Sequence, residues 1–350
     1  MKVFSKRRRG AAALAASLLA LSLAACASGS GGGDTVAAGD DGLVRVSIGG
    51  TTPTMTYSPI LTMLEYDLDA KHGLDVDFEG SGTTGSVVVS GILSNQYPLG
   101  FAASQSTLDA ISQGADLKLV TSTFTQGNTM VVNKKVAAKL APVTATSPIG
   151  DRIDALRGMT IATSQPGSGV NLLLRSILTE NGLDPDKDVK IIGVAEPSAM
   201  VAGLGQGRFD AAIFGTGVLE AAIANGTGDL WFSVAVDDVG PIKNTRGLSL
   251  FGRPDFVKGN EETVDKLRAA LQEAAEKIAA DPDEVSAKLK EKYFPDLDQK
   301  IWDLSWTNIL PAFPTDGAFP KSSFDAFNKL APEPYTMTYD DVVYGPAQAD

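Results

Sequence analysis

The residues with the clearest chemical potential lie in two loops rich in glycine, serine and threonine, at residues 81–86 and 164–169. Each loop follows a short apolar run and precedes a predicted helix, so that bare N–H groups at the helix N-terminus could hold an anionic or polar group. The same hydroxyls could instead cap the helices, and the glycines could simply shape the turns. The candidates for ligand binding from these loops are Thr83, Thr84, Gly85, Ser164, Gly167, Ser168 and Gly169.

The first loop, together with Gly80, matches the glycine pattern of dinucleotide-binding turns. Such a site also needs an acidic residue about twenty positions later to hold the ribose. Here the next strand ends in the neutral run at residues 101–105, and the chain has no G-K-[ST] phosphate loop. The sequence therefore disfavours a nucleotide site.

Few side chains could support catalysis. His72 is the only histidine, and it adjoins Gly73 at a predicted helix C-terminus, where a cation and a glycine both fit a capping role. Nucleophilic triads and multi-histidine metal sites therefore lack members. The sequence does not exclude a pair of catalytic carboxylates of the glycosidase type. We nevertheless expect no enzymatic activity, no cofactor and no metal.

The only cysteine, Cys26, ends the sequence Leu-Ala-Ala-Cys. Five cations lie within residues 1–9 and residues 11–23 are uncharged, which is typical of a secretory signal. A small-residue cleavage site followed directly by cysteine resembles the lipobox of bacterial lipoproteins, which implies a signal peptide at 1–25 and lipidation of Cys26. An ordinary signal with a chance cysteine is the alternative. Residues 26–42 would then form the lipidated end and a flexible tether.

Composition limits the remaining possibilities. The formal net charge of the 350 residues is −12, and loss of the signal would remove five cations and leave about −17. Nucleic acid is therefore not an expected partner. The roughly 310 residues after the tether exceed what one core usually supports, so two lobes are expected. One cysteine allows no internal disulfide.

Short apolar runs alternate with amphipathic stretches from residue 43 onward, which predicts βα units on mainly parallel sheets. The predicted strands are 43–48, 74–78, 99–102, 117–123, 159–162, 189–194, 210–214, 230–236 and 248–251, with a further extended run at 129–133. The predicted helices are 59–71, 85–94, 106–113, 168–181, 197–204, 218–224, 261–280 and 282–291. We expect an α/β protein in which lobe 1 (43–132 and 246–350) is interrupted by lobe 2 (133–245), so that two connections form a hinge.

Ligands of open α/β sheets bind beyond the carboxyl ends of the strands. The segments there are small, hydroxylic or amide-bearing, with few charges. Beside the two loops, they supply the candidates Thr52, Thr54, Tyr57, Ser104, Gln105, Gln126, Phe214 and Thr216, with Phe124 as a further aromatic. Trp302 and Trp306 lie one helical turn apart and could form a wall of the cleft or pack in the core.

Several segments together resemble one family. They are residues 156–162, 166–169, 181–183 with 188–189, and 207–212, followed by 253–256, 260–264 and 279–284. In order and spacing they are similar to ABC-transporter solute-binding proteins of the nitrate/sulfonate/taurine type, and the resemblance covers about residues 43–330.

The resemblance implies a two-lobed periplasmic-binding-protein fold of type II and a role as an extracytoplasmic, membrane-anchored lipoprotein. It also implies a small anionic or polar solute, either sulfonate-, nitrate- or taurine-like or aromatic and pyrimidine-like, delivered to an ABC permease and its ATPase. We expect a monomer. A lipoprotein that senses a solute or docks to a partner without transport is the alternative. Pyrimidine synthases of thiamine biosynthesis resemble the same fold, but they depend on histidine and a cysteine-rich motif that this chain lacks.

Overall fold

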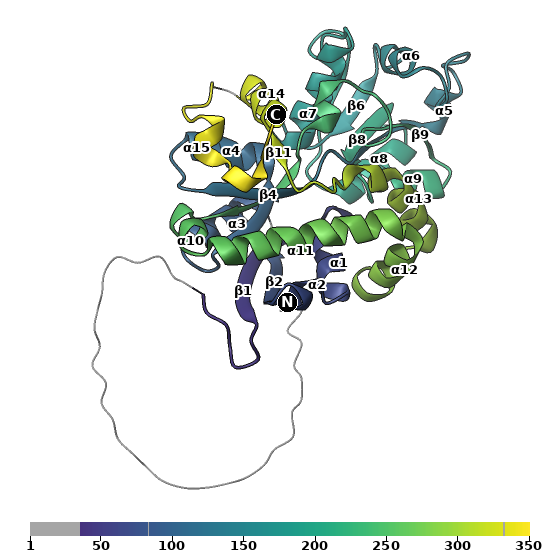
Figure 1. Ribbon diagram of the computed structural model, residues 1–350. Helices are drawn as coiled ribbons and strands as arrows, with labels where there is room; N and C mark the ends of the chain where they lie inside the picture. Colours follow the sequence, from purple (N-terminus) through teal and green to yellow (C-terminus); the bar gives the residue numbers. More distant parts are fainter. Residues whose placement is uncertain (1–35, 83, 332) are drawn as a thin grey trace, which may run out of the picture.

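The computed structural model describes residues 36–82, 84–331 and 333–350 (Figure 1). The proposed signal peptide, Cys26 and Thr83 therefore lie outside the described residues. Two five-stranded sheets, each flanked by helices, make up the α/β architecture that the sequence predicts. Among the described residues, no helix is both long and apolar enough to cross a bilayer.

The first sheet has the strand order β2-β1-β3-β10-β4. Its strands are β1 (Val44–Thr51), β2 (Leu74–Gly82), β3 (Leu99–Ala103), β4 (Lys118–Phe124) and β10 (Leu248–Gly252). β1 pairs in parallel with β2 and β3, whereas β10 runs antiparallel to β3 and β4. Successive strand residues face different cores, as Phe101 and Ala102 illustrate. The inner strands β3 and β10 are therefore buried almost throughout, whereas the edge strand β2 alternates buried apolar residues with more exposed acidic residues.

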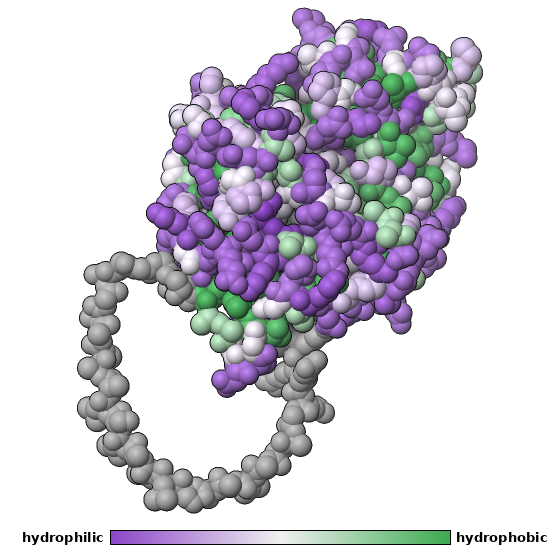
Figure 2. All heavy atoms as spheres, in the orientation of Figure 1, coloured by the Kyte–Doolittle hydropathy of each residue, from purple (hydrophilic) through white to green (hydrophobic). Residues whose placement is uncertain are grey.

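Helices cover both faces of this sheet. One core includes residues of α1 (Ser58–Glu65), α2 (Leu68–Lys71), α11 (Glu261–Ala280), α12 (Pro282–Tyr293) and α13 (Gln299–Ile309). The other core includes residues of α3 (Gly85–Leu93), α4 (Ser104–Ser112), α14 (Lys321–Leu330) and α15 (Tyr339–Val342). The long helix α11 crosses the front of this lobe in Figure 1, and the face that it presents in Figure 2 is mostly hydrophilic.

The second sheet has the order β7-β6-β8-β5-β9. Its strands are β5 (Asn128–Asn133), β6 (Thr160–Thr163), β7 (Lys190–Gly193), β8 (Ala211–Gly215) and β9 (Gly228–Ser233). β6, β7 and β8 are parallel, and β5 runs antiparallel to β8 and β9. Residues of α7 (Gly169–Glu180) join one core of this sheet, and residues of α8 (Pro197–Gly205) and α9 (Glu220–Ala224) join the other.

The chain crosses between the sheets twice. The first crossing is at residues 125–127, between β4 and β5, and the second is at residues 234–247, between β9 and β10. The sequence analysis placed residues 129–132 in lobe 1, whereas β5 pairs with β8 and β9 of the second sheet. An apolar run shows that a strand is present, but the run does not show which sheet the strand joins.

Local backbone chemistry also changes the expected elements. The helix predicted at 59–71 is divided into α1 and α2 because Asp67 between them has φ of 54°, outside the helical region. His72 is the C-cap of α2, followed by Gly73 at φ of 79°, and its Nε2 lies 2.9 Å from Oε2 of Glu273. His72 therefore has the capping position that the sequence predicts.

Trp302 and Trp306 belong to the core. Their side chains are 1% and 5% exposed, and their rings stack with centroids 5.6 Å apart. The remaining short elements are α5 (Lys134–Ala137), α6 (Ile149–Asp154), α10 (Pro254–Gly259), β11 (Phe319–Pro320), β12 (Gln348–Ala349), η1 (Met55–Tyr57), η2 (Pro241–Asn244), η3 (Leu310–Ala312) and η4 (Gly345–Ala347).

Candidate functional site

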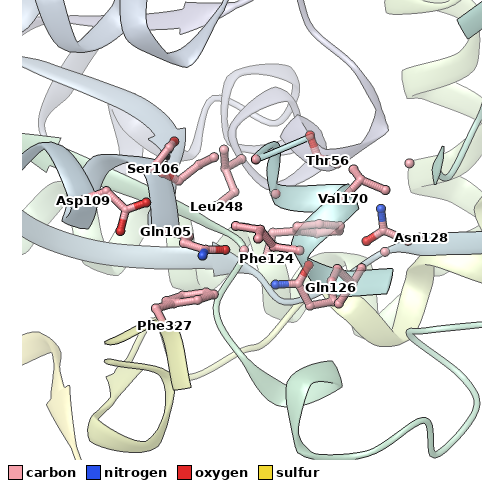
Figure 3. Close-up of a pocket in the computed structure, with 18 residues that line it drawn as sticks. Thr56, Gln105, Ser106, Asp109, Phe124, Gln126, Asn128, Val170, Leu248 and Phe327 are labelled. Carbon is pink, nitrogen blue, oxygen red and sulfur yellow. Dashed lines mark hydrogen bonds between the residues drawn. The ribbon is translucent and has the colours of Figure 1, made fainter. Parts of the chain in front are cut away.

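A cleft of about 240 Å³ lies where the two sheets meet (Figure 3). It is lined from both sides by residues that are mostly apolar or neutral and polar. The first sheet, its helices and the two crossings contribute Thr56, Ala103, Gln105, Ser106, Asp109, Phe124, Gln126, Gly127, Gly247, Leu248 and Phe327. The second sheet and α7 contribute Asn128, Gly167, Gly169, Val170, Leu172, Leu173 and Gly215.

The position of the cleft follows from the topology. Ala103, Phe124 and Gly215 are the last residues of β3, β4 and β8, so the carboxyl ends of these strands open into the cleft. This edge is where open α/β sheets bind ligands, because helix N-termini and irregular loops meet there. Phe124 therefore lines the cleft from the position at which the sequence analysis placed it.

The two crossings are joined to each other beside the cleft. The amide Nε2 of Gln126 donates to Oγ1 of Thr245 at 2.9 Å, and the N–H of Gly247 donates to the carbonyl oxygen of Phe124 at 2.9 Å. A Cβ at Gly247 would lie 2.3 Å from the carbonyl oxygen of Thr125, closer than real Cβ contacts allow. Glycine is therefore required where the crossings touch.

Helix α4 presents two polar side chains to one end of the cleft. Gln105 and Asp109 are four residues apart and share a helix face, and Figure 3 shows them beside Phe327. Gln105 is only 9% exposed, and its Nε2 has no hydrogen-bond partner among the described residues. Asp109 Oδ1 accepts a hydrogen bond from the Tyr335 hydroxyl at 3.0 Å. Burial raises the pKa of Asp109, and the bond from Tyr335 offsets only part of that effect.

The loop before α7 contributes backbone rather than hydroxyl groups. Gly167 and Gly169 line the cleft. The hydroxyls of Ser164 and Ser168 hydrogen-bond to each other, and Ser168 also caps α7 by accepting from the N–H of Asn171 at 3.4 Å. The two serine side chains thus stabilise the loop, and the glycine backbone is left facing the cleft.

Thr84 and Gly85, just before and at the start of α3, are not among the residues that line the cleft. Thr84 is the N-cap of α3 and accepts from the N–H of Val87, and Gly85 begins the helix. Thr52 and Thr54 are exposed and do not line the cleft, although Thr54 hydrogen-bonds to Thr56, which does. The structure thus brings Gln105, Gln126, Gly167 and Gly169 together and places these other candidates outside the lining.

Four further candidates have structural partners. The buried Tyr57 hydroxyl bonds Thr51, and burial raises the pKa of Tyr57. Ser104 is buried and shares a hydrogen bond with Ser249. Thr216 donates its hydroxyl to the carbonyl oxygen of Gly127 at 3.0 Å, and Phe214 packs against a second-lobe core. These side chains shape the walls of the cleft without lining it.

A buried carboxylate holds the turn at the second-lobe edge. Glu220 is 0% exposed, and it accepts hydrogen bonds from the N–H of Gly217 at 2.8 Å and from Oγ1 of Thr129 at 3.0 Å. Burial raises the pKa of Glu220 despite these bonds. Because Gly215 lines the cleft two residues before Gly217, this carboxylate fixes the backbone that faces a ligand. Across the described part of the chain, no three His, Cys, Asp or Glu side chains form a group suited to a metal ion.

The sequence analysis missed several residues of the lining. Asp109 had a usable signal, because it lies one helical turn beyond Gln105. Asn128 follows the first crossing by one residue and could have been found if β5 had been assigned to the second sheet. Phe327 had no signal, since α14 lies more than two hundred residues from α4 in the sequence and only the fold brings the two helices together.

The sequence profile of the NMT1-like family matches residues 43–289. A curated relative, the bicarbonate transport ATP-binding protein CmpC of Synechocystis sp., is 28% identical over 261 residues, which are 71% of this chain and 37% of the relative. The chain therefore spans well under half the length of that relative.

Solved structures with the same fold cover most of the chain. The periplasmic aliphatic sulphonate binding protein SsuA from Escherichia coli has a TM-score of 0.65 at 17% identity, covering 87% of this chain and 94% of SsuA. The periplasmic nitrate-binding protein NrtA from Synechocystis has a TM-score of 0.54 at 16% identity, covering 77% of this chain and 69% of NrtA. These likenesses establish the two-lobed periplasmic-binding-protein fold.

Proposed function

We propose, from the premise that the chain belongs to the NMT1-like family, that it is the extracytoplasmic solute-binding component of an ABC importer. The proposal rests on one observation: a cleft lies between the two sheets, and the two chain crossings that join the sheets contact each other beside it. Sulphonate- and nitrate-binding proteins share this fold, and a protein of bicarbonate transport shares part of the sequence. The solute is a small anion or a small polar organic molecule.

The mechanism is closure of the two lobes about the crossings. A solute favours the closed form only to the extent that it binds that form better than the open one. Gln105 and Phe124 from the first lobe and Gly167 and Gly169 from the second line the same cleft, so a solute there would contact both lobes at once and hold them together. A permease that recognises closed lobes then distinguishes loaded protein from empty protein, and a separate ATPase drives import.

The lining supports binding rather than catalysis. Its polar groups are mainly amides, hydroxyls and backbone, and the sole histidine of the chain is at the C-cap of α2, outside the lining. We assign no reaction to this site.

The N-terminal segment supplies the membrane anchor in this proposal. Cys26 would carry lipid after removal of residues 1–25, and residues 27–35 would tether the folded body near the permease. The predicted tether to residue 42 is too long, because the N–H of Val36 donates to Oδ1 of Asn260 and Ala38 pairs with Val44. A flexible segment of about nine residues would have a root-mean-square span of roughly 16 Å, which would keep the folded body close to the membrane surface.

A thermal-shift panel on the purified chain tests the binding function. Nitrate, bicarbonate, alkanesulfonates, aromatic acids, pyrimidines and small amines form the panel. A solute at about one hundred times its Kd should add roughly 2.7 kcal/mol to the free energy of unfolding. If no compound in the panel shifts the Tm, the solute-binding proposal fails.

A further inference from the structure

The side chains that line the cleft carry a charge that does not favour a simple anion. Among the described residues that line it, Asp109 is the only one with a charged side chain, so the lining supplies a negative charge and no lysine, arginine or histidine. Amides, a serine, a threonine, glycines and apolar side chains make up the rest. An anionic solute would meet a carboxylate without a cationic partner in the lining, whereas a cationic solute would find its counter-charge there.

Asp109 is placed to accept hydrogen bonds from a solute. It is half-buried on α4, and the Tyr335 hydroxyl bonds its Oδ1, which orients the carboxylate at the end of the cleft. A carboxylate removed from water in this way is costly unless a positive charge or donor approaches it. The raised pKa of Asp109 has burial as its main cause and is consistent with that cost.

The surroundings of Asp109 indicate the shape of the solute. Gln105, on the same helix face, lines the cleft and has a buried amide nitrogen without a partner among the described residues. Phe327, Leu248 and Phe124 supply apolar surface to the same cleft, and Figure 3 shows them around Gln105. A charged amino group would match the carboxylate and an apolar body would match this surface, whereas the Gln105 amide nitrogen is a donor and would need an acceptor on the solute.

We propose that the solute carries a positively charged ammonium group that binds the carboxylate of Asp109, with an apolar portion packed against Phe124, Leu248 and Phe327. This proposal rests on the proposed solute-binding function and names the class of solute that the cleft selects. The proposal assigns recognition of the solute's charge to Asp109, on α4 of the first lobe.

Isothermal titration of the purified full chain with matched compounds tests the proposal. Each trio shares one phenylalkyl body of one, two or three methylenes and ends in an ammonium, a hydroxyl or a sulfonate group. We expect at least one amine to bind more tightly than its alcohol and its sulfonate. In D109N, which keeps the side-chain shape and removes the charge, the affinity for that amine should fall roughly tenfold or more.

Two variants provide controls. D116N removes one carboxylate from an exposed position beyond the C-terminal end of α4, outside the lining, and should leave amine affinity unchanged. Y335F removes the hydrogen bond to Asp109 but keeps the charge, so amine binding should persist. The comparison of amine, alcohol and sulfonate in the wild-type chain tests the charge preference even if D109N does not fold.

The outcomes separate this proposal from the proposed function. If a sulfonate binds and its amine does not, or if D109N binds the amine within twofold of the wild type, the ammonium proposal is overturned while solute binding stands. If no compound of any trio binds at millimolar concentration, the ammonium proposal is overturned, and absence of binding across the wider thermal-shift panel would remove the solute-binding function as well.

Discussion

Replacing Gln105 with leucine should stabilise the empty protein and weaken solute binding at the same time. The Gln105 side chain is 91% buried (9% exposed) and its amide nitrogen has no partner among the described residues. A buried donor without a partner costs about 1–3 kcal/mol, so its removal should raise the free energy of unfolding by an amount in that range. Leucine is one bond shorter than glutamine, but its branched apolar end can still contact the neighbouring apolar lining.

Urea denaturation followed by tryptophan fluorescence measures the first effect, because all three tryptophans of the chain are buried in the two lobes. Titration with the best compound of the binding panel measures the second. Q113L is the matched control: Gln113 is the exposed C-cap residue of the same helix, and the change there should alter the free energy of unfolding by less than about 0.5 kcal/mol.

The reasoning depends on the two effects having opposite signs. If Gln105 had a structural role, its substitution would leave a hydrogen-bond partner unsatisfied and would destabilise the protein. If Q105L destabilises the empty protein by 1 kcal/mol or more, Gln105 serves the fold and not the solute. If Q105L is more stable but binds as tightly as the wild type, the amide does not contact the solute.

Two further changes test the hinge and the anchor. G247A should lower the free energy of unfolding by about 1–3 kcal/mol and weaken solute binding, because its Cβ would lie 2.3 Å from the Thr125 carbonyl oxygen. The control G150A, where a Cβ meets nothing within 4 Å, should lower neither the free energy of unfolding nor the affinity for the solute. Equal urea midpoints for the two variants would count against a tight contact between the crossings. C26S should move the chain from the membrane fraction to the soluble fraction and abolish incorporation of labelled fatty acid, and a membrane-bound, labelled C26S protein would rule out lipidation at this cysteine.

Most elements could be predicted from the sequence where the local signal was strong. The helix α11 has the predicted bounds 261–280, since its apolar residues repeat at helical spacing and a proline at 282 starts the next helix. The division between α1 and α2 was not predicted, because a single αL residue at Asp67 leaves the apolar pattern intact. The sheet to which β5 belongs was not predicted either, since strand pairing is a long-range property.

The candidate site could be predicted in part, for a related reason. Strand ends located Gln105, Gln126, Gly167 and Gly169 correctly in the lining. Residues at equivalent strand ends, such as Ser104, proved to have buried protein partners. Hydroxyl groups compete for nearby backbone and side-chain partners, and that competition is decided by neighbours that are distant in sequence.

This competition explains why α4 determines the choice of solute. The hydroxyl groups of the second-lobe loop bond to each other and to the cap of α7, so that lobe offers the solute mainly backbone, which most polar ligands can use. Helix α4 instead offers an amide nitrogen without a protein partner and a carboxylate held in place by Tyr335. Backbone groups hold many solutes, whereas the carboxylate of Asp109 distinguishes one charge from another. A change of solute in a related chain should therefore alter the residues at positions 105 and 109 before it alters either glycine-rich loop.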